Sequence, residues 1–227
     1  MRLLTRALRY AQAFASVGSF NRHTESLIEQ PRLLMKEAFG FCDGFLRPIQ
    51  IEEELLQLLE QVRRIRPRTV LEIGTSMGGT LYLWTRLSQP DALIISVDLP
   101  GGKFGGGYSS LRTPIYRSFA RHRQSLHLLR ADSHSPATFE TLRSLLAGAP
   151  LDFLFIDGDH TYEGVRKDWE MYSPLVRNGI IAFHDIAAIY HDTQVKQLWD
   201  EVKTAYPHQE YAVHPHGHYG IGVLFKS

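Results

Sequence analysis

Between Thr69 and Phe183 the chain alternates short apolar runs with segments whose apolar residues recur at helical spacing. Short apolar runs bounded by polar residues indicate strands that are buried on both faces. Strands that alternate with helices form βαβ units, and these units build a parallel sheet. The chain is therefore predicted to be an α/β protein, with core strands at Thr69–Ile73, Ala92–Val97, Leu126–Arg130, Phe153–Ile156 and Ile180–Phe183.

The same patterns divide the chain into a cap and a domain. Residues 1–48 contain helical fragments that glycines and prolines interrupt, so they are interpreted as a helical cap or arm. Residues 49–227 are interpreted as the main domain. The interrupting residues are Gly18, Pro31, Gly40, Gly44 and Pro48. Helices are predicted over Ile49–Arg64, from the glycine-rich turn after Ile73 up to Leu87, and over Leu111–Gln124, Pro136–Leu146, Tyr162–Tyr172 and Gln194–Ala205. A terminal strand pair is predicted over Glu210–Val213 and Ile221–Phe225.

Residues 1–15 place Arg2, Arg6 and Arg9 among apolar positions, whereas a signal peptide needs an uninterrupted apolar core. We expect an amphipathic helix that packs on the domain or on a second subunit, which would make a homo-oligomer. A basic helix on a membrane surface is a further reading. The predicted apolar face consists of Leu4, Leu8, Ala11 and Ala15.

Composition narrows the class of protein. A chain of 227 residues is the size of one α/β domain with a small appendage. The formal net charge of +1 gives no indication of a nucleic-acid surface. Cys42 is the single cysteine, which excludes an internal disulfide and fits a cytoplasmic location. No run of about 18 apolar residues predicts a membrane span.

Acidic and imidazole groups follow two of the predicted strands. Asp157, Asp159 and His160 come after Phe153–Ile156, and His184 and Asp185 come after Ile180–Phe183. Ligands of open α/β sheets bind outside the carboxyl ends of the strands. We therefore expect these side chains to meet in one cleft, where they could hold a cation, move a proton, or do both. Hydrogen bonding among themselves and capping of the next helix is the alternative.

A glycine-rich turn follows the first strand, in the sequence Glu72-Ile-Gly74-Thr75-Ser76-Met-Gly78-Gly79. Glycines there allow a ligand to approach the backbone. The nicotinamide fingerprint is absent because Ser76 occupies its middle-glycine position, and no phosphate-binding P-loop is present. Glu72 would repel a pyrophosphate and suits a ligand with a cationic group.

Two further acids follow neighbouring strands. Asp98 could accept both hydroxyls of a ribose, or it could be a solvated acid at a strand end. Asp132 could contact an adenine amino group through its side chain or its backbone.

Together these residues resemble the class I S-adenosylmethionine-dependent methyltransferases, over roughly Ile49–Ser227. The glycine-rich turn is similar to the first motif of that superfamily. Residues 155–165 and 183–185 are similar to a bacterial subgroup of macrolide-sugar O-methyltransferases and cephalosporin-hydroxylase-like proteins. The resemblance implies a Rossmann-like, doubly wound sheet of seven strands, with one antiparallel strand near the C-terminus. The cofactor-binding residues it implies are Glu72, Gly74, Thr75, Ser76, Gly78, Asp98, Ala131, Asp132 and Asp157.

The resemblance also implies a metal and a base. Asp157, His184 and Asp185 occupy the positions where related enzymes bind Mg²⁺, and Asp159 could add an oxygen. His184 departs from the family pattern of acids and amides, because imidazole is a poor ligand for Mg²⁺ and suits Mn²⁺, Fe²⁺ or Zn²⁺ better. His160 occupies the position of a catalytic lysine and could act with Asp157 as the general base.

The sequence therefore predicts methyl transfer from S-adenosylmethionine to a hydroxyl of a small molecule, such as a sugar or a phenol. A metal-dependent hydrolase or oxygenase, a nicotinamide oxidoreductase and a non-catalytic S-adenosylmethionine-binding protein are the alternatives. RNA methylation is disfavoured because the basic residues are scattered. A second histidine cluster at His214, His216 and His218 is interpreted as a solvated loop, a subunit contact or part of the acceptor pocket.

Overall fold

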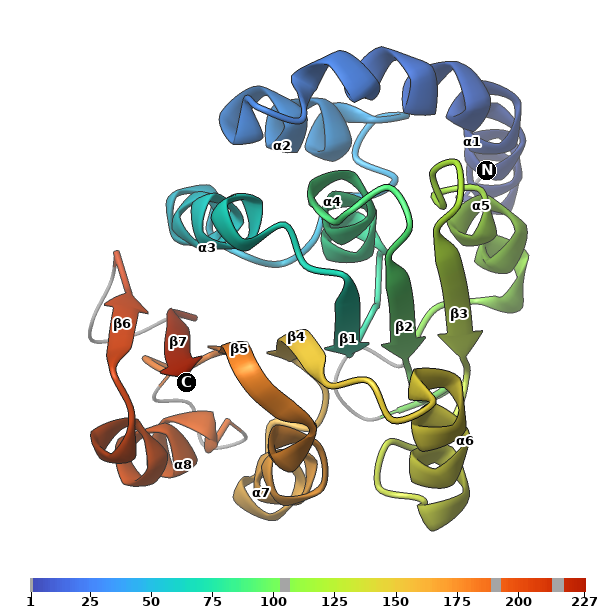
Figure 1. Cartoon of the computed structure of the whole chain (residues 1–227). Coiled ribbons are helices and arrows are strands. Elements are labelled where there is room, and N and C mark those ends of the chain that lie inside the picture. Colours follow the sequence, from blue (N-terminus) through green and yellow to red (C-terminus); the bar gives the residue numbers. More distant parts are fainter. Residues whose placement is uncertain (1, 103–106, 189–192, 214–218) are drawn as a thin grey trace.

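The computed structural model describes residues 2–102, 107–188, 193–213 and 219–227. The chain forms one seven-stranded sheet in the order β3-β2-β1-β4-β5-β7-β6 (Figure 1). The histidine cluster at residues 214–218 lies outside the described residues. The strands are β1 (Thr69–Ile73), β2 (Leu93–Val97), β3 (Ser125–Leu129), β4 (Leu151–Ile156), β5 (Val176–His184), β6 (His208–Tyr211) and β7 (Ile221–Lys226).

The pairing of the strands confirms the predicted fold class. Strands β1 to β5 pair in parallel, and β7 runs antiparallel to both of its neighbours, β5 and β6. The chain moves outward from β1 to β3 and then returns to place β4 on the other side of β1. This reversal creates a crevice at the carboxyl ends of β1 and β4, which is where doubly wound sheets bind ligands.

Helices cover both faces of the sheet and enclose one hydrophobic cluster on each side (Figure 1). Within a strand successive side chains enter opposite clusters, as Val70 and Leu71 do. One face carries α1 (Arg2–Thr24), α2 (Pro31–Gly40), α3 (Glu52–Ile65), α4 (Gly79–Leu87) and α5 (Thr113–Arg117). The other face carries α6 (Pro136–Leu146), α7 (Tyr162–Tyr172) and α8 (Val195–Val202). In the described part of the chain no helix is long and apolar enough to cross a membrane.

The predicted helix over Leu111–Gln124 is wrong in its length. A 3-10 turn over Ser110–Arg112 precedes α5, which begins with Pro114 in its first turn and ends at Arg117. Proline favours a helix start because its missing N–H needs no partner there. The chain then turns back toward β3, with His122 in the left-handed region at φ 39°.

The predicted apolar face of the N-terminal helix is also wrong. Helix α1 continues through the exposed Gly18 and buries Ala13, Val17 and Phe20, whereas Leu8 is 64% exposed. Phe20 decides the orientation, because its ring stacks on Phe41 and Tyr82 at centroid distances of 4.3 and 5.0 Å. A large aromatic side chain gains more from burial than the alanines of the predicted face. Ala11 and Ala15 of that face are exposed.

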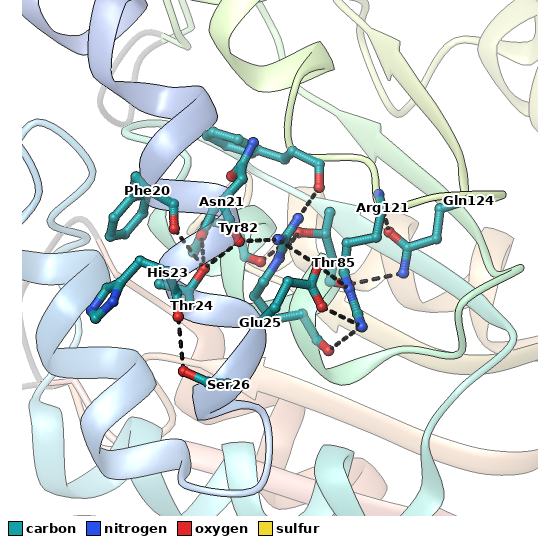
Figure 2. Close-up of polar contacts among 12 residues, drawn as sticks. Phe20, Asn21, His23, Thr24, Glu25, Ser26, Tyr82, Thr85, Arg121 and Gln124 are labelled. Atoms are coloured by element: carbon teal, nitrogen blue, oxygen red, sulfur yellow. Dashed lines mark hydrogen bonds and ion pairs between the residues drawn. The ribbon is translucent and has the colours of Figure 1, made fainter.

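Charged side chains attach the N-terminal segment to α4 and to the segment that precedes β3 (Figure 2). Arg86 of α4 is 1% exposed, and its Nη1 lies 3.4 Å from Glu25 Oε1. Arg121 Nη2 lies 2.7 Å from Glu25 Oε2, so one carboxylate connects two guanidinium groups. Burial lowers the pKa of Arg86 to about 10. Residues 2–48 therefore share both a hydrophobic core and an ionic network with α4. The division of the chain into a cap and a main domain stays a prediction.

Replacement of Glu25 with glutamine is expected to lower the free energy of unfolding by about 1–3 kcal/mol, because Arg86 then loses the carboxylate that compensates its buried charge. Urea denaturation measures this change. Glu29→Gln is the matched control, since Glu29 is 65% exposed and pairs with Arg63 at the surface, where an ion pair contributes about 0–1 kcal/mol. Equal effects of the two substitutions would contradict the anchoring role of Glu25.

Candidate active site

The glycine-rich turn joins three strand ends. Gly74 follows β1 with φ 90°, and a Cβ on it would lie 1.9 Å from the carbonyl oxygen of Asp157, so only glycine fits there. The backbone N–H of Ser76 donates to Asp98 Oδ2 at 2.8 Å. Ser76 has a left-handed backbone, with φ 44°. The turn therefore holds the ends of β1, β2 and β4 in contact.

A cavity of about 180 Å³ opens beside this turn, and we name it the cofactor cavity. Six of the predicted cofactor residues line it: Gly74, Ser76, Asp98, Ala131, Asp132 and Asp157. Asp98 is 8% exposed, and burial raises the pKa of its carboxyl group. A buried carboxylate at a cavity wall is suited to accept hydrogen bonds from a pair of hydroxyls.

The other three predicted cofactor residues lie outside the lining of this cavity. Glu72 is completely buried and accepts a 2.8 Å hydrogen bond from Trp84 Nε1. Burial raises the pKa of Glu72 to about 8, so the group is mostly neutral at pH 7 and its attraction for a cationic ligand is weak. Thr75 bonds to the Ser96 hydroxyl, and Gly78 packs against the ring of Tyr116. Their contact with a cofactor stays a prediction.

His134 lines the cofactor cavity and was missed by the sequence analysis. Its Nε2 lies 3.3 Å from Oδ1 of Asp168, which is completely buried on α7. The nearby Asp168 carboxylate raises the pKa of His134. Asp168 lies on the buried face of α7 together with Val165 and Tyr172. An acid that occupies an apolar position of a helix indicates a buried polar contact, and this pattern was visible in the sequence.

The His134–Asp168 pair predicts a pH-dependent contribution to stability. The pKa of His134 is raised in the folded state, so the contribution is complete below the unfolded pKa of about 6.5 and is lost as pH rises through the folded value. The difference in unfolding free energy between wild type and His134→Gln should therefore be larger at pH 6 than at pH 9. Denaturation series at both pH values measure it, and a difference that grows with pH would contradict the pairing.

A second cavity, of about 270 Å³, shares Gly74, Ser76 and Asp157 with the first, and we name it the acceptor cavity. Its polar wall contains His160, His184 and Asp185 besides Asp157. The predicted meeting of the two strand ends in one cleft is thus observed. Its remaining lining residues are Pro48, Ile49, Gln50, Thr75, Met77, Thr80, Thr193 and Tyr219.

Asp157 stands at the centre of the polar wall. Its Oδ1 lies 3.0 Å from His184 Nδ1 and 3.6 Å from His160 Nε2, and its Oδ2 accepts a 2.6 Å bond from Gln50 Nε2. Burial opposes ionisation, but His184 and His160 lower the pKa of Asp157 to about 2. Asp157 in turn raises the pKa of His184 to about 9 against the effect of burial. Each side chain therefore favours the charged form of the other, so a metal ion held by His184 would have to displace its proton.

Asp185 completes the cluster with a left-handed backbone at φ 64°. Its Oδ2 lies 3.2 Å from His160 Nδ1, and its Oδ1 lies 3.4 Å from His184 Nδ1. His160 therefore has one ring nitrogen toward each of two carboxylates, and although burial opposes its charge, Asp157 and Asp185 raise its pKa.

Asp157, His184 and Asp185 offer ligand atoms within 4.8 Å of one another, which suits a divalent cation. Two carboxylates and one imidazole favour Mn²⁺ over Mg²⁺. Asp159 does not join them, contrary to the prediction, because its Oδ1 accepts hydrogen bonds from the backbone N–H and the hydroxyl of Thr161 at the start of α7. Short acidic side chains commonly make such local bonds at helix starts.

Residues 71–186, about half of the chain, match a family described as a methyltransferase domain. The chain belongs to this methyltransferase family, which confirms the resemblance drawn from the glycine-rich turn and the strand ends. The crevice, the two adjoining cavities and the acid–histidine cluster all lie within or beside the matched segment.

Two relatives match this chain by sequence. An uncharacterized protein of Acanthamoeba polyphaga mimivirus is 30% identical over 145 residues, 62% of each chain. One from Sinorhizobium fredii is 28% identical over 169 residues, which are 72% of this chain and 18% of that protein. This chain thus matches less than two thirds of either relative.

Two solved structures, one of an O-methyltransferase and one of a methyltransferase, share the fold. TomG from Streptomyces achromogenes, solved with S-adenosylmethionine, is 18% identical, with 87% of this chain and 90% of that chain covered at a TM-score of 0.56. The calicheamicin methyltransferase CalS11 is 14% identical, with 92% and 91% covered at a TM-score of 0.58.

Proposed function

We propose that this chain transfers a methyl group from S-adenosylmethionine to a hydroxyl of a small molecule. The observation that carries the proposal is that the cofactor cavity and the acceptor cavity share a wall at Gly74, Ser76 and Asp157. Two ligands in these cavities would meet at that wall, and holding two reactants in line contributes about 7–11 kcal/mol to a bimolecular reaction. Membership of the methyltransferase family supports methyl transfer over a hydrolase or an oxygenase.

The residues of the cofactor cavity have the chemistry that S-adenosylmethionine requires. Asp98 would accept the two ribose hydroxyls, and Ala131 and Asp132 would lie on the adenine side. The amino-acid end of the ligand would lie beside Gly74, which lines this cavity. When bound, S-adenosylmethionine supplies the methyl group as its carbon–sulfur bond breaks, and it leaves as S-adenosylhomocysteine.

The polar wall of the acceptor cavity would orient and deprotonate the acceptor. Asp157 would hold the acceptor hydroxyl, and His160 in its neutral form would take the proton as the new oxygen–carbon bond forms. The lining also includes the apolar residues Pro48, Ile49 and Met77, so the cavity suits a ring compound that has a polar edge, such as a sugar or a phenol. CalS11, which shares the fold, is described as a TDP-rhamnose 3′-O-methyltransferase.

A divalent metal would be held by Asp157, His184 and Asp185 in our proposal. Bound there, it would lower the pKa of a coordinated hydroxyl as a Lewis acid. His184 makes Mn²⁺ the better candidate than Mg²⁺. Calorimetric titration with both ions, in wild type and in Asp185→Asn, tests the site.

We also propose a cytoplasmic location, no nucleic-acid partner and a homo-oligomer formed through α1. Leu8 and Phe14 of α1 are 64% and 65% exposed, so both side chains are available for contact with a second subunit. Light scattering on wild type and on Phe14→Ser measures the oligomeric state. A monomeric wild type would contradict this part of the proposal.

Replacement of His160 with alanine is expected to lower methyl transfer about 10²-fold while S-adenosylhomocysteine binding stays nearly intact, because His160 lines the acceptor cavity only. The assay measures S-adenosylhomocysteine formed with a panel of phenols and sugars. Unchanged turnover in His160→Ala would remove this residue from the mechanism.

A further inference from the structure

A buried carboxylate on α3 lies outside both the proposed cofactor contacts and the acid–histidine cluster. Glu54 is 1% exposed, although it belongs to the first turn of a helix whose neighbouring residue, Glu53, is exposed. Among the described residues no cation forms an ion pair with Glu54. Burying a carboxylate costs a large free energy unless hydrogen-bond donors contact its oxygens. The donors that contact Glu54 therefore indicate its role.

Those partners are two backbone groups near the C-terminus. Val213 N–H donates to Glu54 Oε1 at 2.8 Å, and Gly220 N–H donates to Glu54 Oε2 at 3.0 Å. One side chain therefore fixes two points of the connection between β6 and β7. Hydrogen bonds to a charged acceptor are the stronger kind in proteins, so this arrangement can hold a backbone in a set position.

The backbone held in this way carries Tyr219 into the acceptor cavity. Tyr219 and Gly220 have successive left-handed conformations, with φ 59° and 87°. Such a conformation at a non-glycine residue persists only where neighbouring structure holds it. Ala187 N–H donates to Tyr219 O at 2.8 Å, and the Tyr219 ring stacks on His184 at a centroid distance of 5.5 Å and an interplanar angle of 19°.

We propose that Glu54 is a positioning residue of the acceptor site. By fixing the backbone at Val213 and Gly220, Glu54 holds the Tyr219 ring on the face of His184. The tyrosine ring then forms the wall against which a ring-shaped acceptor packs. The positioning of Tyr219 is a property of the fold, whereas its use by an acceptor rests on the proposed function. The same cavity presents the carboxylates of Asp157 and Asp185, which suits an acceptor ring that bears hydroxyls.

The stacking of Tyr219 on His184 gives a readout that needs no ligand. An aromatic ring shifts the NMR signals of protons above its face, so the ring protons of His184 report the position of Tyr219. Histidine-labelled protein is measured at one pH, and the His184 signals are identified by their loss in His184→Gln. The effect of Tyr219→Leu on these signals is recorded in the wild-type and in the Glu54→Gln background, which cancels the direct effect of the Glu54 charge.

We expect Tyr219→Leu to shift the His184 signals clearly in the wild-type background and only weakly in the Glu54→Gln background. Glu53→Gln is the matched control, and Tyr219→Leu should have its full effect in that background. An equally large effect in all three backgrounds would overturn the positioning role of Glu54. Glu54→Gln keeps the shape of the side chain, and circular dichroism confirms that it is folded.

Calorimetry with S-adenosylhomocysteine separates this inference from the proposed function. Glu54 and Tyr219 do not line the cofactor cavity, so wild type, Glu54→Gln and Tyr219→Leu should bind S-adenosylhomocysteine within about twofold of one another. A wild type that does not bind it would contradict the proposed function and leave the NMR result on Glu54 intact. A selective loss of binding in Glu54→Gln would contradict a role confined to the acceptor site.

Discussion

Asp157→Asn is expected to lower methyl transfer by about 10⁴-fold. Among the acids that the structure describes, Asp157 alone lines both cavities, and it also contacts His184 and His160. Asparagine keeps the shape but removes the charge, so the side chain can neither support the charge that His160 gains as the base nor compensate a charge on His184. The rate of S-adenosylhomocysteine formation with an accepted phenol or sugar measures the effect.

The same substitution should also lower the free energy of unfolding by about 1–3 kcal/mol, since a buried imidazolium then keeps only Asp185 as a partner. Asp91→Asn is the control, because Asp91 is 42% exposed and pairs with Arg68 at the surface. Its expected effect on stability is within about 0.5 kcal/mol. A folded Asp157→Asn with normal turnover would show that the shared wall is not the site of reaction.

Asp98→Ala is expected to weaken S-adenosylhomocysteine binding by about 10²-fold or more. Asp98 lies at the end of β2 and faces the cofactor cavity, where its carboxylate would accept two ribose hydroxyls. Each hydrogen bond to a charged group contributes about 1.5–3 kcal/mol. The substitution also removes the acceptor of the Ser76 N–H, which loosens the glycine-rich turn. Calorimetric titration measures the dissociation constant.

Asp132→Ala serves as the control for Asp98. Asp132 lines the same cavity, but its side chain is 52% exposed, and its Oδ1 already accepts a hydrogen bond from the backbone N–H of His134. We expect Asp132→Ala to weaken binding by less than about tenfold. An Asp98→Ala variant that binds as tightly as wild type would exclude the ribose role of Asp98.

The strands and their ends were predictable because the relevant forces are local. Buried parallel strands are continuous apolar runs, so β1, β2, β4 and β5 are visible in the sequence to within a few residues. The polar groups that follow them must then meet at one edge of the sheet. The proximity of Asp157, His160 and His184 was therefore predictable from the sequence.

The parts that escaped prediction depend on contacts between distant segments. Gln50 precedes α3 and shows no motif, yet it bonds to Asp157, which lies 107 positions later in the chain. In the sequence Glu54 resembles an ordinary solvated acid in the first turn of a helix. Its role depends on the backbone N–H groups of Val213 and Gly220, which are distant in the chain and donate to its carboxylate. The orientation of α1 likewise follows from the rings of Phe41 and Tyr82 rather than from its own periodicity.

Calorimetric titration of the wild-type protein with S-adenosylhomocysteine, with NAD⁺ as the competing dinucleotide, tests the central claim most directly. The cofactor cavity predicts saturable binding of one S-adenosylhomocysteine per chain and none of NAD⁺, because Ser76 replaces the glycine that a pyrophosphate requires. Binding of NAD⁺, or of neither compound, would contradict methyl transfer at its first step and leave the acid–histidine cluster without the proposed reaction.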